Sequence, residues 1–150
     1  MITTPETRNR VLIIEDERKT FEGWLAELKS RNIEADVATD PDEAVSRLTS
    51  SVYTVILLDL MLPFGSTKSA RTNESRYDVG VEILNRIRNG DFESHGTPAD
   101  VPVVVITANT ETTVIERVRR LNPESICSKP ESPRYLAEHI KSLLRKDNDT

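Results

Sequence analysis

The run Val55-Ile56-Leu57-Leu58-Asp59 decides the fold, because four apolar residues in succession are closed by an aspartate. A strand that is apolar on both faces is typical of a parallel sheet with helices on both sides. Four further candidate strands lie at 11–14, 33–38, 103–106 and 125–128. The sequence therefore predicts an α/β fold, a doubly wound five-stranded parallel sheet.

Stretches with helical periodicity separate these candidate strands. The first has apolar residues at i, i+3, i+4 and i+7, namely Phe21, Trp24, Leu25 and Leu28. The second begins with Asp40 as N-cap, and Glu43 completes a capping box. Three more apolar stripes cover 81–87, 114–121 and 136–144. We expect a polar tail at 1–9, one domain over 10–146 and a short tail at 147–150.

Composition excludes several classes of protein. The 150 residues carry a formal net charge of -5 and no long basic run, so direct contact with nucleic acid is not expected. No apolar stretch is long enough to cross a bilayer, and the amino-terminal residues lack the apolar core of a signal peptide. The lone Cys127 excludes an internal disulfide. We expect a cytoplasmic protein that does not insert into membranes.

The residues that follow the apolar runs carry the chemistry, because ligands of open parallel sheets bind beyond the carboxyl ends of the strands. These residues are Glu15, Asp16, Asp59, Thr107 and Lys129. Clustered carboxylates repel one another unless a cation lies between them, and an oxygen-rich set suits Mg²⁺. An aspartate beside a lysine and a hydroxyl can act as a nucleophile toward a phosphoryl group.

Four stretches together resemble the receiver domain of two-component response regulators, which has a (βα)5 flavodoxin-like fold. They are Val11 to Glu17, Val55 to Pro63, Val105 to Ala108 and Ser128 to Pro130. The resemblance implies that Asp59 accepts a phosphoryl group from a histidine kinase or a phosphotransfer protein. A downstream protein effector would then read the phosphorylated state.

The resemblance also assigns roles to the neighbouring residues. Asp16 and Asp59 would ligate Mg²⁺, for which Mn²⁺ can substitute; Glu15 would act largely through water, and Met61 through its backbone carbonyl. Thr107 and Lys129 would contact the phosphoryl oxygens, and the small Ala108 would leave room for them. The chain would catalyse only its own phosphorylation and slow dephosphorylation, so it would not be an enzyme acting on an external substrate.

The chain departs from the family pattern in two places. Ile126 stands where most relatives have an aromatic residue that reports phosphorylation. The glycine that relatives place about four residues after the proline corresponds to Gly80, so an insertion covers about 64–78. Its cations Lys68, Arg71 and Arg76 are equally compatible with a surface loop and with a lid over the acceptor.

Other functions are possible for such a chain. A phosphatase of the haloacid-dehalogenase type needs a second aspartate two positions after the first, and Met61 stands there. A receiver-fold binding module with atypical or phosphorylation-independent output is the remaining alternative, because Ile126 removes the usual aromatic. The residues after Lys129 suffice for one helix and a tail, so we expect a single-domain regulator whose output is protein–protein contact.

Overall fold

The computed structural model describes residues 10–63, 76–108, 111–129 and 132–148. The expected amino-terminal tail lies outside these residues, as does the insertion over 64–75 with Lys68 and Arg71. In α3 (Arg76–Arg88) and α5 (Pro133–Asn148), the side chains of 76–77 and 145–148 are likewise outside the description, and these include the side chain of Arg76.

The predicted sheet is confirmed. Its strands are β1 (Arg10–Ile14), β2 (Glu34–Ala38), β3 (Val55–Asp59), β4 (Val103–Thr107) and β5 (Ser125–Ser128). They form one sheet in the order β2-β1-β3-β4-β5, and every neighbouring pair is parallel. This order reverses between β1 and β3, which is the point where such sheets open a crevice at their carboxyl ends.

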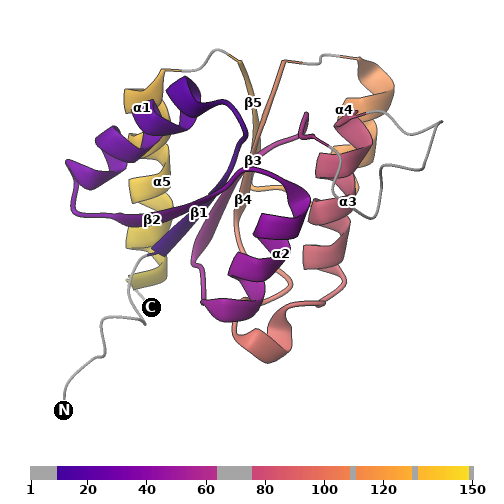
Figure 1. Ribbon diagram of the computed structural model, residues 1–150, viewed down its shortest axis with the longest axis horizontal. Coiled ribbons are helices and arrows are strands. Elements are labelled where there is room, and N and C mark those ends of the chain that lie inside the picture. The colour runs from indigo at the N-terminus through magenta and orange to yellow at the C-terminus, as the bar shows by residue number, and fades with distance from the viewer. Residues whose placement is uncertain (1–9, 64–75, 109–110, 130–131, 149–150) are drawn as a thin grey trace.

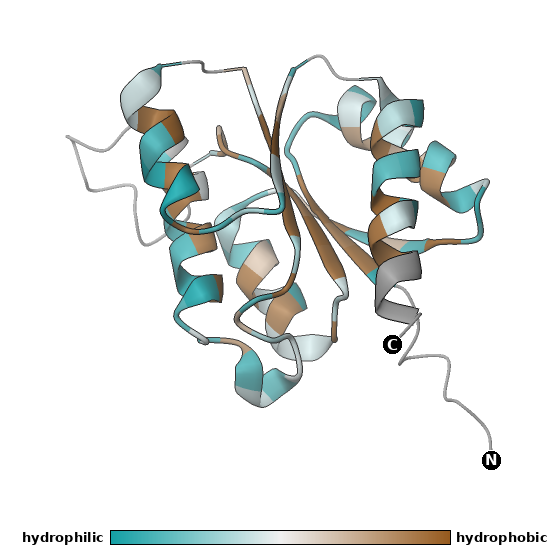
Figure 2. Ribbon diagram, turned by 180° about the vertical axis from the view of Figure 1, so that it is seen from behind, coloured by the Kyte–Doolittle hydropathy of each residue, from teal (hydrophilic) through white to brown (hydrophobic). Residues whose placement is uncertain are grey.

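Helices cover both faces of the sheet, so the fold is doubly wound (Figure 1). One face carries α1 (Arg18–Lys29) and α5 (Pro133–Asn148), and the other carries α2 (Pro41–Ser50), α3 (Arg76–Arg88) and α4 (Thr112–Arg119). A short 3-10 helix, Glu93–His95, was not predicted. The apolar sides of the helices face the sheet in Figure 2.

Alternate residues of each central strand belong to opposite cores. Leu12, Ile14, Ile56 and Leu58 pack under α2, α3 and α4, whereas Val11, Ile13, Val55 and Leu57 pack under α1 and α5. All of these strand residues are fully buried. Burying one such side chain stabilises a fold by about 1.5–3 kcal/mol, so the two cores hold the strand ends firmly in place.

Helix α2 begins at the predicted cap, with one difference. The Asp40 carboxylate accepts the Glu43 N–H at 2.8 Å, as a capping box requires. The Glu43 carboxylate, however, accepts from the backbone and hydroxyl of Thr39, at 2.8 and 2.9 Å, and not from the N–H of Asp40. The reciprocal half of the box is therefore displaced by one residue.

Two helices extend into segments that the sequence suggested as loop or tail. Helix α3 begins at Arg76, so its first turn includes residues 76–78, which the insertion was expected to cover. Helix α5 continues to Asn148 and includes two residues of the expected carboxyl-terminal tail. The predicted end of α3 is confirmed, because the helix stops at Arg88 and Gly90 follows with a φ of +85°.

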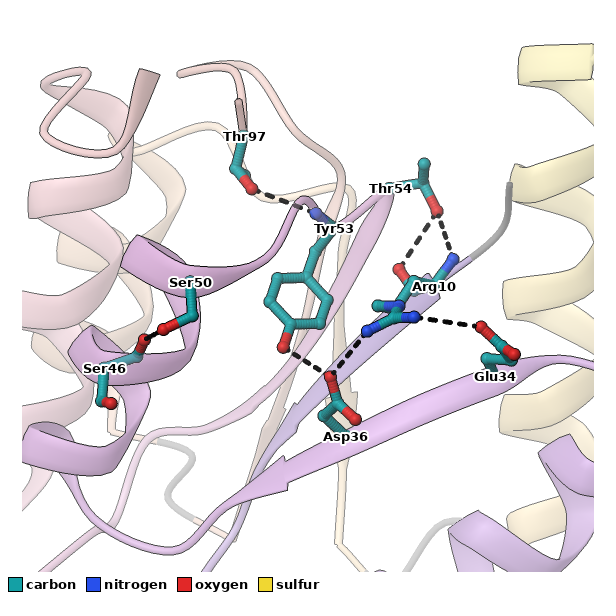
Figure 3. Close-up of polar contacts among 8 residues, drawn as sticks. All are labelled: Arg10, Glu34, Asp36, Ser46, Ser50, Tyr53, Thr54 and Thr97. Atoms are coloured by element: carbon teal, nitrogen blue, oxygen red, sulfur yellow. Dashed lines mark hydrogen bonds and ion pairs between the residues drawn. The ribbon is translucent and has the colours of Figure 1, made fainter. Parts of the chain in front are cut away.

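A polar network closes the amino ends of the strands, at the opposite end of the sheet from the candidate site (Figure 3). The hydroxyl of the fully buried Tyr53 donates to Asp36 at 2.7 Å, and Arg10 lies 3.6 Å from the same carboxylate oxygen. The Tyr53 N–H donates to the hydroxyl of Thr97 at 3.1 Å. These bonds tie the loops before β3 and β4 to β1 and β2.

Candidate functional site

The parallel register brings the predicted residues to one edge of the sheet. Asp59 is the last residue of β3 and lies opposite Ile106, one residue before Thr107 on β4. Glu15 directly follows β1, and Lys129 directly follows β5. Because strands β1, β3, β4 and β5 follow one another in the sheet, four side chains that are distant in sequence meet in one crevice.

Three carboxylates gather in this crevice. Glu15, Asp16 and Asp59 each offer one carboxylate oxygen, and these atoms all lie within 4.8 Å of one another. Glu15 is fully buried and Asp59 is 3% exposed, whereas Asp16 is the most open of the three. The predicted acidic cluster therefore exists, with two members inside the protein and one at its entrance.

Asp59 is held at both carboxylate oxygens. Its Oδ1 accepts the N–H of Met61 at 3.1 Å, and its Oδ2 lies 3.0 Å from the ammonium of Lys129. Burial raises the pKa of Asp59, while the charge and hydrogen bond of Lys129 act to lower it. The contact with the N–H also places the backbone of Met61 beside the acceptor.

Glu15 is the second buried acid of the crevice, and its two carboxylate oxygens have different partners. Its Oε2 accepts the N–H of Glu17 at 2.9 Å. Its Oε1 lies 2.9 Å from the Lys129 ammonium as an ion pair, but at an angle outside that of a hydrogen bond. Burial, and then repulsion by Asp59, raise the pKa of Glu15 from 4.5 to about 7.

The donor set fits a divalent cation. Among the described residues, Glu15 Oε1 is the one buried side-chain oxygen without a hydrogen bond, and it belongs to the acidic cluster. Lys129 contacts this oxygen as an ion pair at 2.9 Å, but a single positive charge does not neutralise three clustered carboxylates. Three carboxylates that converge in this way are the hard oxygen ligands that Mg²⁺ takes.

Lys129 places one positive charge between the two buried acids. Burial acts to lower the pKa of Lys129, but its contacts with Glu15 and Asp59 and their negative charges outweigh burial and raise that pKa. Its backbone N–H also donates to the carbonyl of Thr107 at 3.0 Å. The lysine therefore enters the crevice from a backbone that is fixed to β4.

Thr107 and Ala108 occupy the β4 side of the crevice. Thr107 is 3% exposed, while Ala108 is exposed and lines a hollow together with Lys129. Thr107 also lines a separate hollow of about 390 Å³ between α4 and β5, with Ile115 and Ile126. Ile126 is half-buried there.

Gly80 has a structural reason to be glycine. Its N–H donates to the carbonyl of Leu60 at 3.2 Å, and a Cβ at Gly80 would collide with the backbone oxygen and Cα of Leu60. Helix α3 can thus approach the end of β3 only without a side chain at this position. This contact fixes the backbone directly after Asp59.

A family model of the response regulator receiver domain matches residues 11–141. The chain belongs to this family. As a receiver domain of two-component systems, it is 30% identical over 139 residues to the phosphate regulon transcriptional regulatory protein PhoB of Escherichia coli (strain K12), covering 91% of this chain and 52% of that protein. It is 29% identical over 150 residues to the transcriptional regulatory protein ResD of Bacillus subtilis (strain 168), covering 100% and 53%.

The receiver chain spans about half the length of the curated relatives that it matches. Solved structures share its fold. A two-component response regulator from Clostridium difficile has a TM-score of 0.73 at 22% identity and covers 94% of this chain and 99% of its own. A CheY-like receiver domain protein from Methanospirillum hungatei JF-1 has a TM-score of 0.71 at 19% identity, with coverages of 95% and 98%.

Sequence reasoning missed two features of the receiver site. It did not predict that the Lys129 ammonium pairs with both Glu15 and Asp59, while the contact of Lys129 with phosphoryl oxygens stays a prediction. It placed Trp24 in the core, which is confirmed at 4% exposure, but this side chain also lines the hollow beside Lys129. The available signal was Gly23, an unexplained glycine in the middle of a helix.

Among the described helices, none has the length and apolarity that a membrane crossing requires.

Proposed function

We propose that this receiver domain accepts a phosphoryl group on Asp59 and thereby switches its contacts with other proteins. The observation that carries the proposal is the position of Lys129, whose ammonium lies 2.9 Å from Glu15 and 3.0 Å from Asp59. One cation thus holds the acceptor carboxylate within an acidic cluster. The donor is a phosphohistidine of a histidine kinase or a phosphotransfer protein, and the reader is a downstream protein in the cytoplasm.

The residues present can perform the acceptor chemistry. An Asp59 oxygen is the nucleophile, and the N–H of Met61 orients its carboxylate. When bound by Asp16, Asp59, the Met61 carbonyl and, through water, Glu15, Mg²⁺ supplies positive charge that offsets the repulsion between the carboxylate and an incoming phosphoryl group. The Lys129 ammonium and the Thr107 hydroxyl are placed to bind phosphoryl oxygens, and Ala108 leaves space for them.

Phosphorylation then changes the charge that Lys129 faces. An acyl phosphate on Asp59 replaces the single carboxylate charge with a phosphoryl group of charge close to −1.5 to −2, and its new acceptor oxygens compete with Glu15 for the ammonium. The backbone bond between Lys129 and Thr107 connects that competition to β4 and β5. The chain acts on itself alone, because Met61 stands where a phosphatase needs a general acid.

The test is intact-mass spectrometry after incubation with acetyl phosphate. We expect the wild-type chain to gain one phosphoryl group with Mg²⁺ or Mn²⁺ and none with EDTA. Asp59→Asn should stay unlabelled, while Asp91→Asn, which alters an exposed carboxylate far from the crevice, should label normally. Equal labelling of Asp59→Asn and wild type would refute Asp59 as the acceptor.

A second candidate function is output that does not depend on phosphorylation. Ile126 favours it, because this short side chain lines the hollow between α4 and β5 instead of an aromatic ring that could rotate there. Equal capture of the same partner by phosphorylated wild type and by Asp59→Asn would support this function. Partner capture by the phosphorylated form alone would exclude it.

A further inference from the structure

The backbone directly after Asp59 is held between β4 and α3. The Leu60 N–H donates to the carbonyl of Ile106 at 3.2 Å, and the Leu60 carbonyl accepts the N–H of Gly80 at 3.2 Å. The Leu60 side chain is fully buried, and a Cβ at Gly80 would collide with the Leu60 backbone. A shift of the chain at Leu60 therefore either breaks these contacts or moves α3.

Phosphorylation of Asp59 requires such a shift. One carboxylate oxygen of Asp59 accepts the N–H of Met61 at 3.1 Å, and the other lies 3.0 Å from the Lys129 ammonium. In an acyl phosphate, one of these oxygens becomes the uncharged bridge to phosphorus, so the partner of that oxygen must turn to a phosphoryl oxygen. Leu60 lies between Asp59 and Met61 in the chain, so this rearrangement reaches its contact with Gly80.

Both ends of α3 are bonded to the last turn of α4 and to the residues after it. The two helices are neighbours (Figure 1). In the first turn of α3, the Asp78 carboxylate accepts from the Arg117 guanidinium at 2.6 Å. In the last turn of α3, the Arg88 guanidinium donates to the carbonyls of Leu121 and Asn122, at 2.8 and 2.9 Å. Helix α4 is therefore fastened to α3 by charged groups.

The two ends of α3 differ in what else holds them. The half-buried Arg88 also donates to the carbonyls of Ala99 and Val101, at 2.7 and 2.8 Å, which fixes this end to the chain that enters β4. The other end carries Asp78, two residues from the Gly80 contact with the backbone that follows the acceptor. A push at Gly80 therefore turns α3 about its Arg88 end and displaces Asp78.

Helix α4 has room to follow this displacement. On the side away from α3, a hollow of about 390 Å³ separates α4 from β5. Ile115 of α4 and Ile126 of β5 line this hollow, and the charged side chains of Glu116 and Arg119 border it. Helix α4 is thus bonded on its α3 side and faces open space on its β5 side, so it moves more readily with α3 than with β5.

We propose that α3 carries the phosphorylation state of Asp59 to α4, and that α4 follows it through the Asp78–Arg117 ion pair. The inference rests on the proposed function and specifies its output. The hollow between α4 and β5 changes in size with the state of the acceptor, because packed helices convert small shifts into discrete rearrangements. This relay does not depend on an aromatic ring at Ile126.

The test is amide hydrogen exchange of α4, residues 112–119, followed by mass spectrometry with and without acetyl phosphate and Mg²⁺. Intact mass confirms equal phosphorylation of every variant. In the wild type, phosphorylation should change the exchange rates of α4 by about fivefold or more, the low end of usual coupling between sites. Arg117→Gln should reduce that change by about two- to fivefold, the contribution of a partly exposed ion pair, whereas Arg117→Lys keeps the charge and should preserve most of it.

Two further variants separate the relay from general loosening of α3. Asp78→Asn removes the charge on the other side of the pair and should act as Arg117→Gln does. Arg86→Gln is the matched control, because it breaks the 2.9 Å ion pair with Asp91, which does not reach α4. This control should leave the response of α4 unchanged.

Three results would overturn the inference. They are an α4 that does not respond in the phosphorylated wild type, an equal response in wild type, Arg117→Gln and Asp78→Asn, and an equal reduction by Arg86→Gln. If acetyl phosphate did not label the wild type at all, the proposed function would fail, and not the relay through α3.

Discussion

The ammonium of Lys129 lies 2.9 Å from Oε1 of the fully buried Glu15, yet it makes no hydrogen bond to that oxygen. This ion pair and the hydrogen bond from the Glu17 N–H act to lower the pKa of Glu15, but burial and repulsion by Asp59 outweigh them. Burial and the nearby Asp59 raise the pKa of Glu15 to about 7. Without a bound cation, the folded protein holds a proton on Glu15 that the unfolded chain loses near pH 4.5.

The first prediction follows from this difference. A raised pKa in the folded state stabilises the fold below the unfolded pKa, and the stabilisation is lost as the pH rises toward the folded value. In EDTA, the melting temperature should therefore fall between pH 5 and pH 7.5, with a change in unfolding free energy of at most about 3 kcal/mol. Because Mg²⁺ takes ionised carboxylates as ligands, a bound ion should raise the melting temperature more at pH 7.5 than at pH 5.

Glu15→Gln provides the control for this pH dependence. The amide cannot ionise, so the slope of melting temperature against pH in EDTA should become shallower. Lys129 should not contribute in this window, because its raised pKa lies well above it. If the slope were the same in wild type and Glu15→Gln, another group would be its source.

The second prediction concerns the contact between Gly80 and Leu60. Gly80→Ala places a Cβ against the Leu60 backbone, so α3 or the end of β3 must move. Overpacking of this kind costs about 1–3 kcal/mol, which should appear as a clear drop in melting temperature. Because Leu60 directly follows Asp59, phosphorylation by acetyl phosphate should slow as well.

Gly23→Ala is the matched control for Gly80→Ala. Both glycines lie inside helices without a positive φ, but only Gly80 lacks room for a methyl group. The two substitutions should therefore shift the melting temperature in opposite directions. A stabilised Gly80→Ala protein would show that α3 does not depend on its close approach to β3.

Much of this architecture is readable from the sequence, because each apolar run has two buried faces and ends on a polar side chain. Asp59, Thr107 and Lys129 were placed in this way, and parallel register alone brings them together. The start of α3 could not be predicted from the sequence, because Arg76 to Asp78 lack apolar periodicity. Helix α4 ends at Arg119, so Leu121, which continues its apolar stripe, lies beyond the helix.

Contacts between helices and strands could be predicted from the sequence less well than the helices and strands themselves. That Lys129 faces Glu15 as well as Asp59 depends on the spacing of β1 and β5 across β3 and β4. The space beside Gly23 depends on how closely α5 approaches α1, which no local pattern encodes. Local sequence therefore predicts which residues reach the crevice, and tertiary packing decides what each of them contacts there.

The last prediction separates the roles of the two acids that follow β1. Asp16 is the most open carboxylate of the cluster, so we expect it to contact Mg²⁺ directly. Glu15 already uses one oxygen for the Glu17 N–H. Losing a residue that contacts a metal only through water or another ligand typically weakens metal binding by about 10–100-fold. We expect Glu15→Gln to fall in this range and Asp16→Asn to weaken Mg²⁺ binding further.

Trp24 provides the measurement for this comparison, because its side chain lines the same hollow as Lys129 and Ala108. Titration of Mg²⁺ against Trp24 fluorescence should give the dissociation constants, with calorimetry as an independent check. Glu124→Gln, an exposed carboxylate before β5 at the other end of the sheet, should leave the affinity unchanged. A larger loss for Glu15→Gln than for Asp16→Asn would reverse the assignment, making the buried carboxylate the direct ligand and Lys129 its competitor.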